Sequence, residues 1–171
     1  RDGETTLLSL LGCVIYPSAG ELFVDGQHVN AMKEKALSRL LLFSIGFVFQ
    51  NFNLIGDMTV FENVAFPLRE KLRLKGPDVT HRVEEKLEQV GLAGMGHKFP
   101  AELSGGMRKR AGLARALVMQ PEIILFDEPT TGLDPLMAKS IHDLITSMQR
   151  KFGFTAVMVS HEIPEIFGIS D

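Results

Sequence analysis

Apolar residues along this chain form two patterns, short continuous runs and stripes at helical spacing. Continuous runs predict strands at Ile45–Phe49, Ile123–Phe126 and Thr155–Val159, and the last two are expected to be buried on both faces. Glu21–Gly26 predicts a further short strand that ends in an Asp-Gly turn. Stripes at helical spacing predict helices over the following ranges: 5–11, 32–42, from about 60, about 80–90, 104–117 and from 135. The strands lie on both sides of a mainly helical middle, which predicts an α/β core with a helical insertion.

Polar residues mark where several of these helices begin. Thr59 and Glu62 have the spacing of a capping box, and Pro67 is expected to kink or shorten the helix that follows. Ser104 is a predicted N-cap, as is Asp134, which is followed by proline at the first helical position. The helix after Asp134 is predicted to bury this stripe: Leu136, Met137, Ile141, Leu144, Ile145 and Met148.

Composition places the chain among ordinary globular proteins. It has 171 residues, of which 45% are hydrophobic and 23% charged, as expected of one soluble domain with room for a subdomain. A net charge of −3 gives no general reason to expect nucleic-acid binding, and the single Cys13 excludes an internal disulfide. No apolar run approaches the roughly 20 residues that span a bilayer, so any membrane role is expected to be peripheral and through a partner.

Polar residues follow the predicted strands directly. Gln50 comes after the first long strand, Asp127 and Glu128 after the second, and His161 after the third. Ligands of open α/β sheets bind beyond the carboxyl ends of the strands, so these side chains are candidates for one site.

Two glycine-containing segments open predicted helices. Ser104, Gly105 and Gly106 begin the helix that runs to Leu117, and Gly3-Glu4-Thr5-Thr6 begins the first helix. Free N–H groups at a helix start attract phosphate. Ser104-Gly105-Gly106 alone is better explained as the start of an ordinary capped amphipathic helix.

Together these residues have the composition of a phosphoryl-transfer site. Thr5 offers a hydroxyl and Asp127 a carboxylate for Mg²⁺, and Glu128 offers a base for the attacking water. His161 is a candidate partner of the γ-phosphate, and Gln50 of the metal or the water.

The same motifs, in this order, resemble those of the nucleotide-binding domain of an ABC transporter. Leu103–Met107 resembles the signature motif, with methionine where glutamine is more usual. Ile123–Glu128 resembles Walker B with its catalytic glutamate, and Gly132–Asp134 resembles the D-loop. Phe49-Gln50 resembles the Q-loop and His161 the switch histidine.

This resemblance implies a P-loop NTPase (RecA-like) core with an inserted helical subdomain. Residues 1–171 would form part of a single ABC ATPase domain, with the core at 1–50 and 118–171 and the helical subdomain at 51–117. Two such domains, here a homodimer, would enclose two ATP molecules with Mg²⁺. Ser104, Gly105 and Gly106 would contact the γ-phosphate held by the other subunit, and Asp134 would lie in the D-loop near the nucleotide.

The resemblance also implies partners and a location. The helical subdomain would meet the permease subunits at the cytoplasmic face of the inner membrane. Phe47–Glu70 and Ser160–Asp171 look most like the Mla-type ATPases, which drive phospholipid or other lipid movement across the Gram-negative envelope with a permease and an MCE-type substrate-binding protein.

Gly3-Glu4-Thr5-Thr6 departs from the expected phosphate loop. The pattern is G-x-x-x-x-G-K-[ST], and Glu4 occupies the lysine position that normally reaches the β- and γ-phosphates. An ion pair about 4 Å apart at an effective dielectric of about 20 is worth about 4 kcal/mol, so the reversed charge predicts poor ATP binding. An inactivating substitution, a degenerate domain and a fragment with an unreliable start all explain Glu4. We favour the fragment, because the chain starts inside a motif and the later motifs are intact.

Other interpretations stay open from the sequence. The chain also fits a non-transport ABC ATPase of ribosomes or DNA, or a regulatory domain that binds nucleotide without turnover. Arg108-Lys109-Arg110 is predicted to form a solvated helix face. The remaining histidines lack metal-ligand spacing and are predicted to lie at the surface or on helix faces: His28, His81, His97 and His142.

Overall fold

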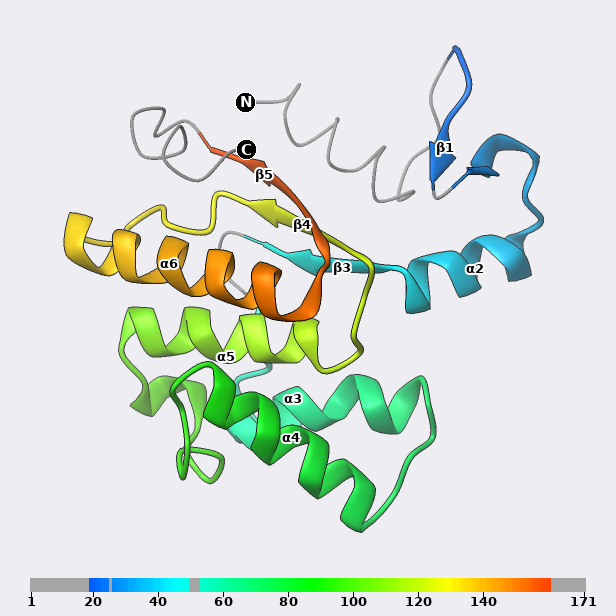
Figure 1. The fold of residues 1–171 in the computed structure, drawn as a ribbon. Helices are drawn as coiled ribbons and strands as arrows, with labels where there is room; N and C mark the ends of the chain where they lie inside the picture. The colour runs from blue at the N-terminus through cyan, green and yellow to red at the C-terminus, as the bar shows by residue number, and fades with distance from the viewer. Residues whose placement is uncertain (1–18, 25, 50–52, 161–171) are drawn as a thin grey trace.

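The computed structural model describes residues 19–24, 26–49 and 53–160 (Figure 1). The side chains of residues 41 and 42 are not described. The helix predicted at Thr5–Leu11 therefore lies outside the described residues, and the observations below concern the described ranges.

Three parallel strands form the central sheet. They are β3 (Ile45–Val48), β4 (Ile123–Asp127) and β5 (Thr155–Val159), in the order β3-β4-β5. A separate antiparallel hairpin joins β1 (Phe23–Val24) to β2 (Gln27–His28). The strand predicted over Glu21–Gly26 is thus shorter than expected.

The prediction of buried strands is confirmed for β4 and wrong for β5. Residues Ile124–Phe126 are at most 1% exposed, because β4 lies between two neighbours and is covered on both faces. In β5, Thr155 and Ala156 are exposed. Among the described strands β5 pairs with β4 alone, which leaves the start of β5 uncovered on its other side.

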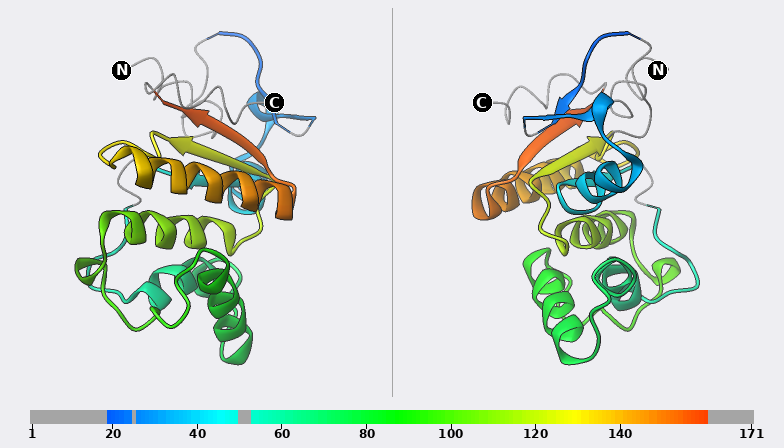
Figure 2. Two further views of the ribbon diagram at one scale, coloured as in Figure 1. Left: turned by 60° about the vertical axis from the view of Figure 1, so that its left-hand side comes forward. Right: turned by 90° about the vertical axis from the view of Figure 1, so that its right-hand side faces the viewer.

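Helices α3 to α6 lie in layers below the sheet (Figures 1 and 2). Helix α5 (Gly105–Leu117) packs against β3 and against α6 (Pro135–Phe152). Helices α3 (Val60–Glu70) and α4 (Pro77–Gln89) pack on the side of α5 that faces away from the sheet. Helix α2 (Glu34–Phe43) leads into β3, and two short 3₁₀ turns complete the described elements, η1 (Val29–Ala31) and η2 (Pro100–Glu102).

The side chains of β4 divide the core in two. Ile124 and Phe126 face a large cluster built with the helices α3 to α6, whereas Leu125 faces a smaller cluster with α2 and the hairpin. This alternation follows from the pleat of a strand, which sends successive side chains to opposite faces. In the part of the chain that the structure describes, no helix combines the length and apolarity needed to cross a membrane.

The predicted capping box of α3 is confirmed. The Thr59 hydroxyl accepts a hydrogen bond from the Glu62 N–H at 3.1 Å, and the Glu62 carboxylate accepts one from the Thr59 N–H at 2.7 Å. The second of these bonds, together with the bond from the Thr59 hydroxyl, holds the pKa of Glu62 below its ordinary value. Local sequence therefore determines where α3 begins.

Three details of the helices differ from the predictions. Pro67 is expected to kink or shorten helix α3, but the helix continues past Pro67 to Glu70 and is not shortened there, with the fully buried Leu68 packing its last turn into the core. Helix α4 begins at Pro77, because a proline at the first helical position needs no N–H partner. Leu136 is 77% exposed and does not join the buried stripe of α6.

A buried asparagine closes the loop before α3. Asn63 is 0% exposed, and its carbonyl oxygen accepts a hydrogen bond from the Ile55 N–H at 2.7 Å. Its amide donates to the backbone oxygens of Ile55, Met58 and Thr59, each at 3.0 Å. One side chain therefore satisfies several backbone groups of residues 55–59.

We expect Asn63→Ala to lower the free energy of unfolding by about 2–3 kcal/mol, because it leaves buried backbone groups without partners. Urea denaturation followed by circular dichroism measures this change. The matched control is Asn30→Ala, since the exposed Asn30 also accepts a hydrogen bond from a backbone N–H, that of Leu22. The control is expected to cost less than about 1 kcal/mol. Equal losses in the two variants would contradict the structural role of Asn63.

Candidate functional site

The predicted site residues that the structure describes gather at one edge of the sheet. The parallel strands β3, β4 and β5 end there, and helices α5 and α6 begin on the same side (Figure 1). Asp127 is the last residue of β4 and pairs with Val159 of β5. The edge thus combines carboxylates at strand ends with the N–H groups of helix starts.

Glu128 is held in an unusual backbone conformation directly after β4. Its φ angle is +46°, in the left-handed region that residues with a side chain seldom adopt. Its N–H donates to the Val159 oxygen at 2.9 Å, and its carboxylate accepts a hydrogen bond from the Thr131 hydroxyl at 2.8 Å. Strained residues held by their surroundings cluster at functional sites, which makes Glu128 the strongest candidate at this edge.

The start of α5 has the predicted cap. The Ser104 hydroxyl accepts a hydrogen bond from the Met107 N–H at 3.2 Å. Helix geometry leaves the N–H groups of the first turn without partners inside the helix, and those of Gly105 and Gly106 belong to that turn. The segment can therefore present donors to an anion.

Gly106 packs against α6. A Cβ atom at this position would meet the Met137 Cε, the far end of a flexible side chain that would have to move aside, and one at Gly105 would lie 3.7 Å from a methyl group of Leu133. The start of α5 thus touches the segment that leads into α6. The segments containing the predicted signature and D-loop residues are neighbours in space.

Asp134 caps α6 as predicted. One oxygen of its carboxylate accepts hydrogen bonds from the N–H groups of Leu136 and Met137, both at 3.1 Å. These contacts account for an aspartate at this position by helix capping alone.

The solvated basic face predicted at Arg108-Lys109-Arg110 is wrong for two of its members. Lys109 is only 8% exposed, and its ammonium donates to the backbone oxygens of Pro129 and Thr131 at 2.7 and 2.9 Å. Arg110 donates to the Val90 oxygen at 2.9 Å and to the Ser140 hydroxyl at 2.7 Å. These partners are distant in sequence, so helical spacing did not reveal them.

Several predicted site residues lie outside the described residues. They are Gly3, Glu4, Thr5, Thr6, Gln50 and His161. Of the histidines predicted at the surface or on helix faces, His81 and His97 are exposed, and His142 lies on a face of α6, where it is 4% exposed. His142 lies on the core side of α6, beside Ile141 and Ile145, which are also buried.

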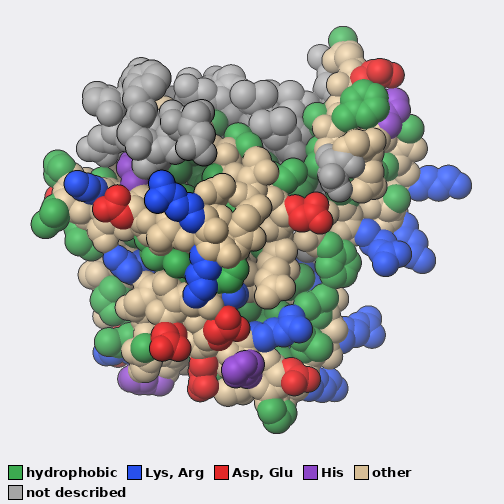
Figure 3. All heavy atoms as spheres, viewed as in Figure 1, with side chains coloured by type: hydrophobic (Ala, Val, Ile, Leu, Met, Phe, Trp, Pro, Cys, Tyr) green, Lys and Arg blue, Asp and Glu red, His purple; other side chains and the backbone are tan. Residues whose placement is uncertain are grey.

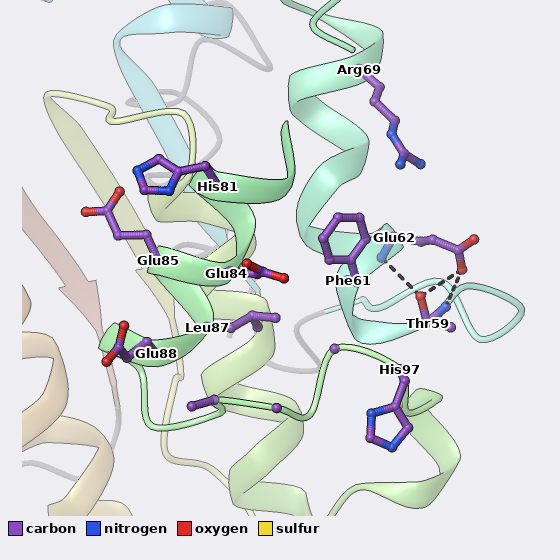
Figure 4. A pocket seen from close by; sticks show the side chains of 13 residues that line it. Thr59, Phe61, Glu62, Arg69, His81, Glu84, Glu85, Leu87, Glu88 and His97 are labelled. Carbon is purple, nitrogen blue, oxygen red and sulfur yellow. Dashed lines mark hydrogen bonds between the residues drawn. The ribbon is translucent and has the colours of Figure 1, made fainter. Parts of the chain in front are cut away.

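A separate cavity of about 760 Å³ lies between α3, α4 and the loop before η2 (Figure 4). Phe61 and Leu87 line it, and carboxylates and histidines surround them, among them Glu84, Glu88 and His97. Part of this acidic surface is visible over α4 in Figure 3. The cavity contains none of the residues predicted to bind nucleotide.

The donors at the sheet edge suit phosphate chemistry. Oxygen ligands such as the Asp127 carboxylate are those that Mg²⁺ prefers, and helix N–H groups are those that phosphate oxygens accept. Among the described residues, no group of three or more His, Cys, Asp or Glu side chains is placed to hold a metal.

Comparison with known proteins identifies the family of this chain. A family model described as ABC transporter matches residues 2–131. The Escherichia coli (strain K12) intermembrane phospholipid transport system ATP-binding protein MlaF is 44% identical over 169 residues, which are 99% of this chain and 62% of that protein. The Caulobacter vibrioides methionine import ATP-binding protein MetN is 42% identical over 99% of this chain and 50% of its own length. The chain thus spans less than two thirds of either relative.

Solved structures share the fold. A dimeric, post-hydrolysis state of the ATP-binding cassette MJ0796, bound to ADP and Pi, has a TM-score of 0.82 at 36% identity, covering 95% of this chain and 72% of that one. The protein cbiO1 from Clostridium perfringens, part of the ABC transporter complex cbiONQ, has a TM-score of 0.90 at 30% identity, covering 99% and 66%. The fold is accordingly the α/β fold of a P-loop NTPase of the ABC type, and the chain belongs to the ABC transporter family.

Proposed function

We propose that this chain binds and hydrolyses ATP as part of an ABC transporter subunit. The observation that carries the proposal is the Glu128 carboxylate, held by the Thr131 hydroxyl beside Asp127 at the strand edge where α5 begins. Glu128 would accept the proton of the attacking water. His161 would contact the γ-phosphate, and Gln50 would orient the water.

Mg²⁺ fits the donors of this edge. Asp127 would hold it with the Thr5 hydroxyl and Gln50, all oxygen ligands of the kind that the ion prefers. When bound, Mg²⁺ neutralises charge that develops on the phosphates. Gly3, Glu4, Thr5 and Thr6 would surround the phosphates from the chain's own side.

We further propose that the working form is a homodimer. Ser104, Gly105 and Gly106 would complete the ATP site of the partner, with Asp134 close to it, because the first turn of α5 offers N–H donors at the molecular edge. The dimeric state described for the MJ0796 cassette supports this arrangement.

Glu4 is expected to oppose ATP binding, because it stands at the lysine position of the phosphate loop. We expect the full-length protein with Glu4 to turn over ATP slowly and Glu4→Lys to raise kcat/KM by at least about 100-fold, because a repulsion is replaced by an attraction. Steady-state phosphate release measures both. Adding Glu128→Gln to Glu4→Lys is expected to abolish turnover while leaving ATP binding intact. Zero turnover of the folded Glu4→Lys protein, with its membrane partners present, would refute the proposed activity.

A groove of about 520 Å³ offers a docking place for a permease. It lies between β3, α3 and α5, and its rim carries the exposed apolar side chains Ile55 and Phe66, which are 38% and 39% exposed. Lys71 also lines it, and burial lowers the pKa of this lysine. We propose that a short cytoplasmic helix of the permease fills this groove and so holds the subunit at the cytoplasmic face of the inner membrane, peripherally.

We expect Phe66→Ser to weaken co-purification with the permease by about 10-fold or more, because an apolar anchor at an interface is lost. ATP turnover of the detached subunit is expected to stay unchanged. Phe23→Ser is the matched control, since Phe23 is also exposed, at 56%, but lies in the β1–β2 hairpin and does not line the groove. Retention of the permease by Phe66→Ser, or equal loss in both variants, would contradict docking at this groove.

For the cargo we propose phospholipid or another lipid, with an MCE-type substrate-binding protein as a further partner. The support is the similarity to MlaF proteins, at 44% identity for Escherichia coli and 41% for Haemophilus influenzae. MetN proteins reach 42% and 40%. The proposal of a lipid cargo therefore rests on the resemblance of Phe47–Glu70 and Ser160–Asp171 to the Mla-type ATPases more than on the sequence identity over the whole chain.

A direct comparison of cargoes tests this proposal. The full-length Glu4→Lys subunit is assembled with its own permease in proteoliposomes, and transfer of labelled phospholipid to acceptor vesicles is followed with ATP. We expect ATP-dependent transfer that Glu128→Gln abolishes, and no stimulation of ATP turnover by methionine. Stimulation by methionine without lipid transfer would overturn the lipid assignment and leave the ATPase assignment standing.

A further inference from the structure

Lys109 is a buried cation whose acceptors lie in the loop after β4. Its side chain is 8% exposed, and two of its three donors reach the backbone oxygens of Pro129 and Thr131. A charge is buried at low cost only when hydrogen bonds replace its water. The ammonium and this loop therefore determine each other's position.

The same loop holds Glu128. The backbone oxygen of Thr131 accepts a hydrogen bond from Lys109. The hydroxyl of the same residue donates a hydrogen bond to the Glu128 carboxylate at 2.8 Å. On the other side, the Glu128 N–H is bonded to Val159 of β5. Glu128 has a positive φ angle that its own conformational preference disfavours, so its orientation depends on these external contacts.

Lys109 lies in the helix that begins with Ser104. One side chain thus joins two segments of the proposed site. They are the start of α5, which can present N–H donors to an anion, and the loop that carries Glu128. The contact between Gly106 and Met137 joins the start of α5 to α6, the helix that follows this loop, through packing alone.

We propose that Lys109 is a positioning residue, which fixes the Glu128 carboxylate relative to the start of α5 by holding the backbone of Pro129 and Thr131. The inference rests on the proposed ATPase function and adds a residue to it. Lys109 does not touch the nucleotide; it acts through Thr131 on the group that receives the proton. A displaced general base slows the chemical step and leaves nucleotide binding largely unaffected.

The test uses the full-length Glu4→Lys protein with its membrane partners. We expect Lys109→Met to lower kcat by about 10-fold or more and to change KM for ATP by less than about 2-fold. Lys109→Arg, which keeps the charge and the donors, is expected to restore at least about a third of the parental kcat. Thr131→Val is expected to lower kcat similarly, and the double variant no further, because both residues act on the same carboxylate.

Lys86→Met is the matched control. Lys86 is also a buried lysine, 3% exposed, but its ammonium bonds to Gln89 and lies over the Phe152 ring, away from the strand edge. It is expected to lower the melting temperature without changing kcat per folded protein. If Lys109→Met behaves in the same way, Lys109 is merely structural and the inference is overturned.

Two further outcomes are decisive. If Lys109→Met does not fold, Thr131→Val still tests the link, and a parental kcat for that variant would overturn it. If the parent protein hydrolyses no ATP, the proposed function fails and this inference fails with it. Parental turnover that is insensitive to Lys109→Met refutes the inference alone.

Discussion

The burial of α5 is the constraint on which the rest of the structure depends. This helix lies between the sheet and the pair α3 and α4, so most of its surface is covered, although Arg108 stays exposed. Small residues such as Ala111, Gly112 and Ala114 allow its neighbours to approach closely. Its buried and partly buried cations need protein acceptors in place of the water they lose.

Those acceptors belong to different parts of the chain. Lys109 bonds to the loop after β4, Arg110 to the end of α4 and to α6, and Arg115 to the Asn53 oxygen at 2.9 Å. A single helix therefore organises the segment after β3, the segment after β4 and the helical layer. A shift of α5 would displace each of these segments. This gives a physical basis for coupling between the sheet edge where nucleotide is proposed to bind and the groove beside Phe66.

Local features were predictable from the sequence, and tertiary ones were not. The capping residues Thr59, Ser104 and Asp134 act on N–H groups only two or three residues away, so their spacing predicted the helix starts correctly. The burial of Lys109 depends on carbonyls about 20 residues further along the chain, and no periodicity encodes that contact. The continuation of α3 past Pro67 likewise depends on Leu68 being buried by other elements.

Glu128 was predicted as a site residue from its place after a strand. Its left-handed backbone conformation and its hydrogen bond to Thr131 became known only from the structure. The roles of Gly3, Glu4, Thr5, Thr6, Gln50 and His161, and the domain limits at residues 50 and 118, stay predictions.

The contact between Gly106 and Met137 has a consequence for which residues position 106 can accept. The Met137 Cε is the far end of a flexible side chain, so a rotation at position 137 can make room for a Cβ atom at position 106. The contact with α6 alone therefore does not require glycine there. The case for glycine at position 106 then rests on the close approach of the anion proposed to bind at the first turn of α5.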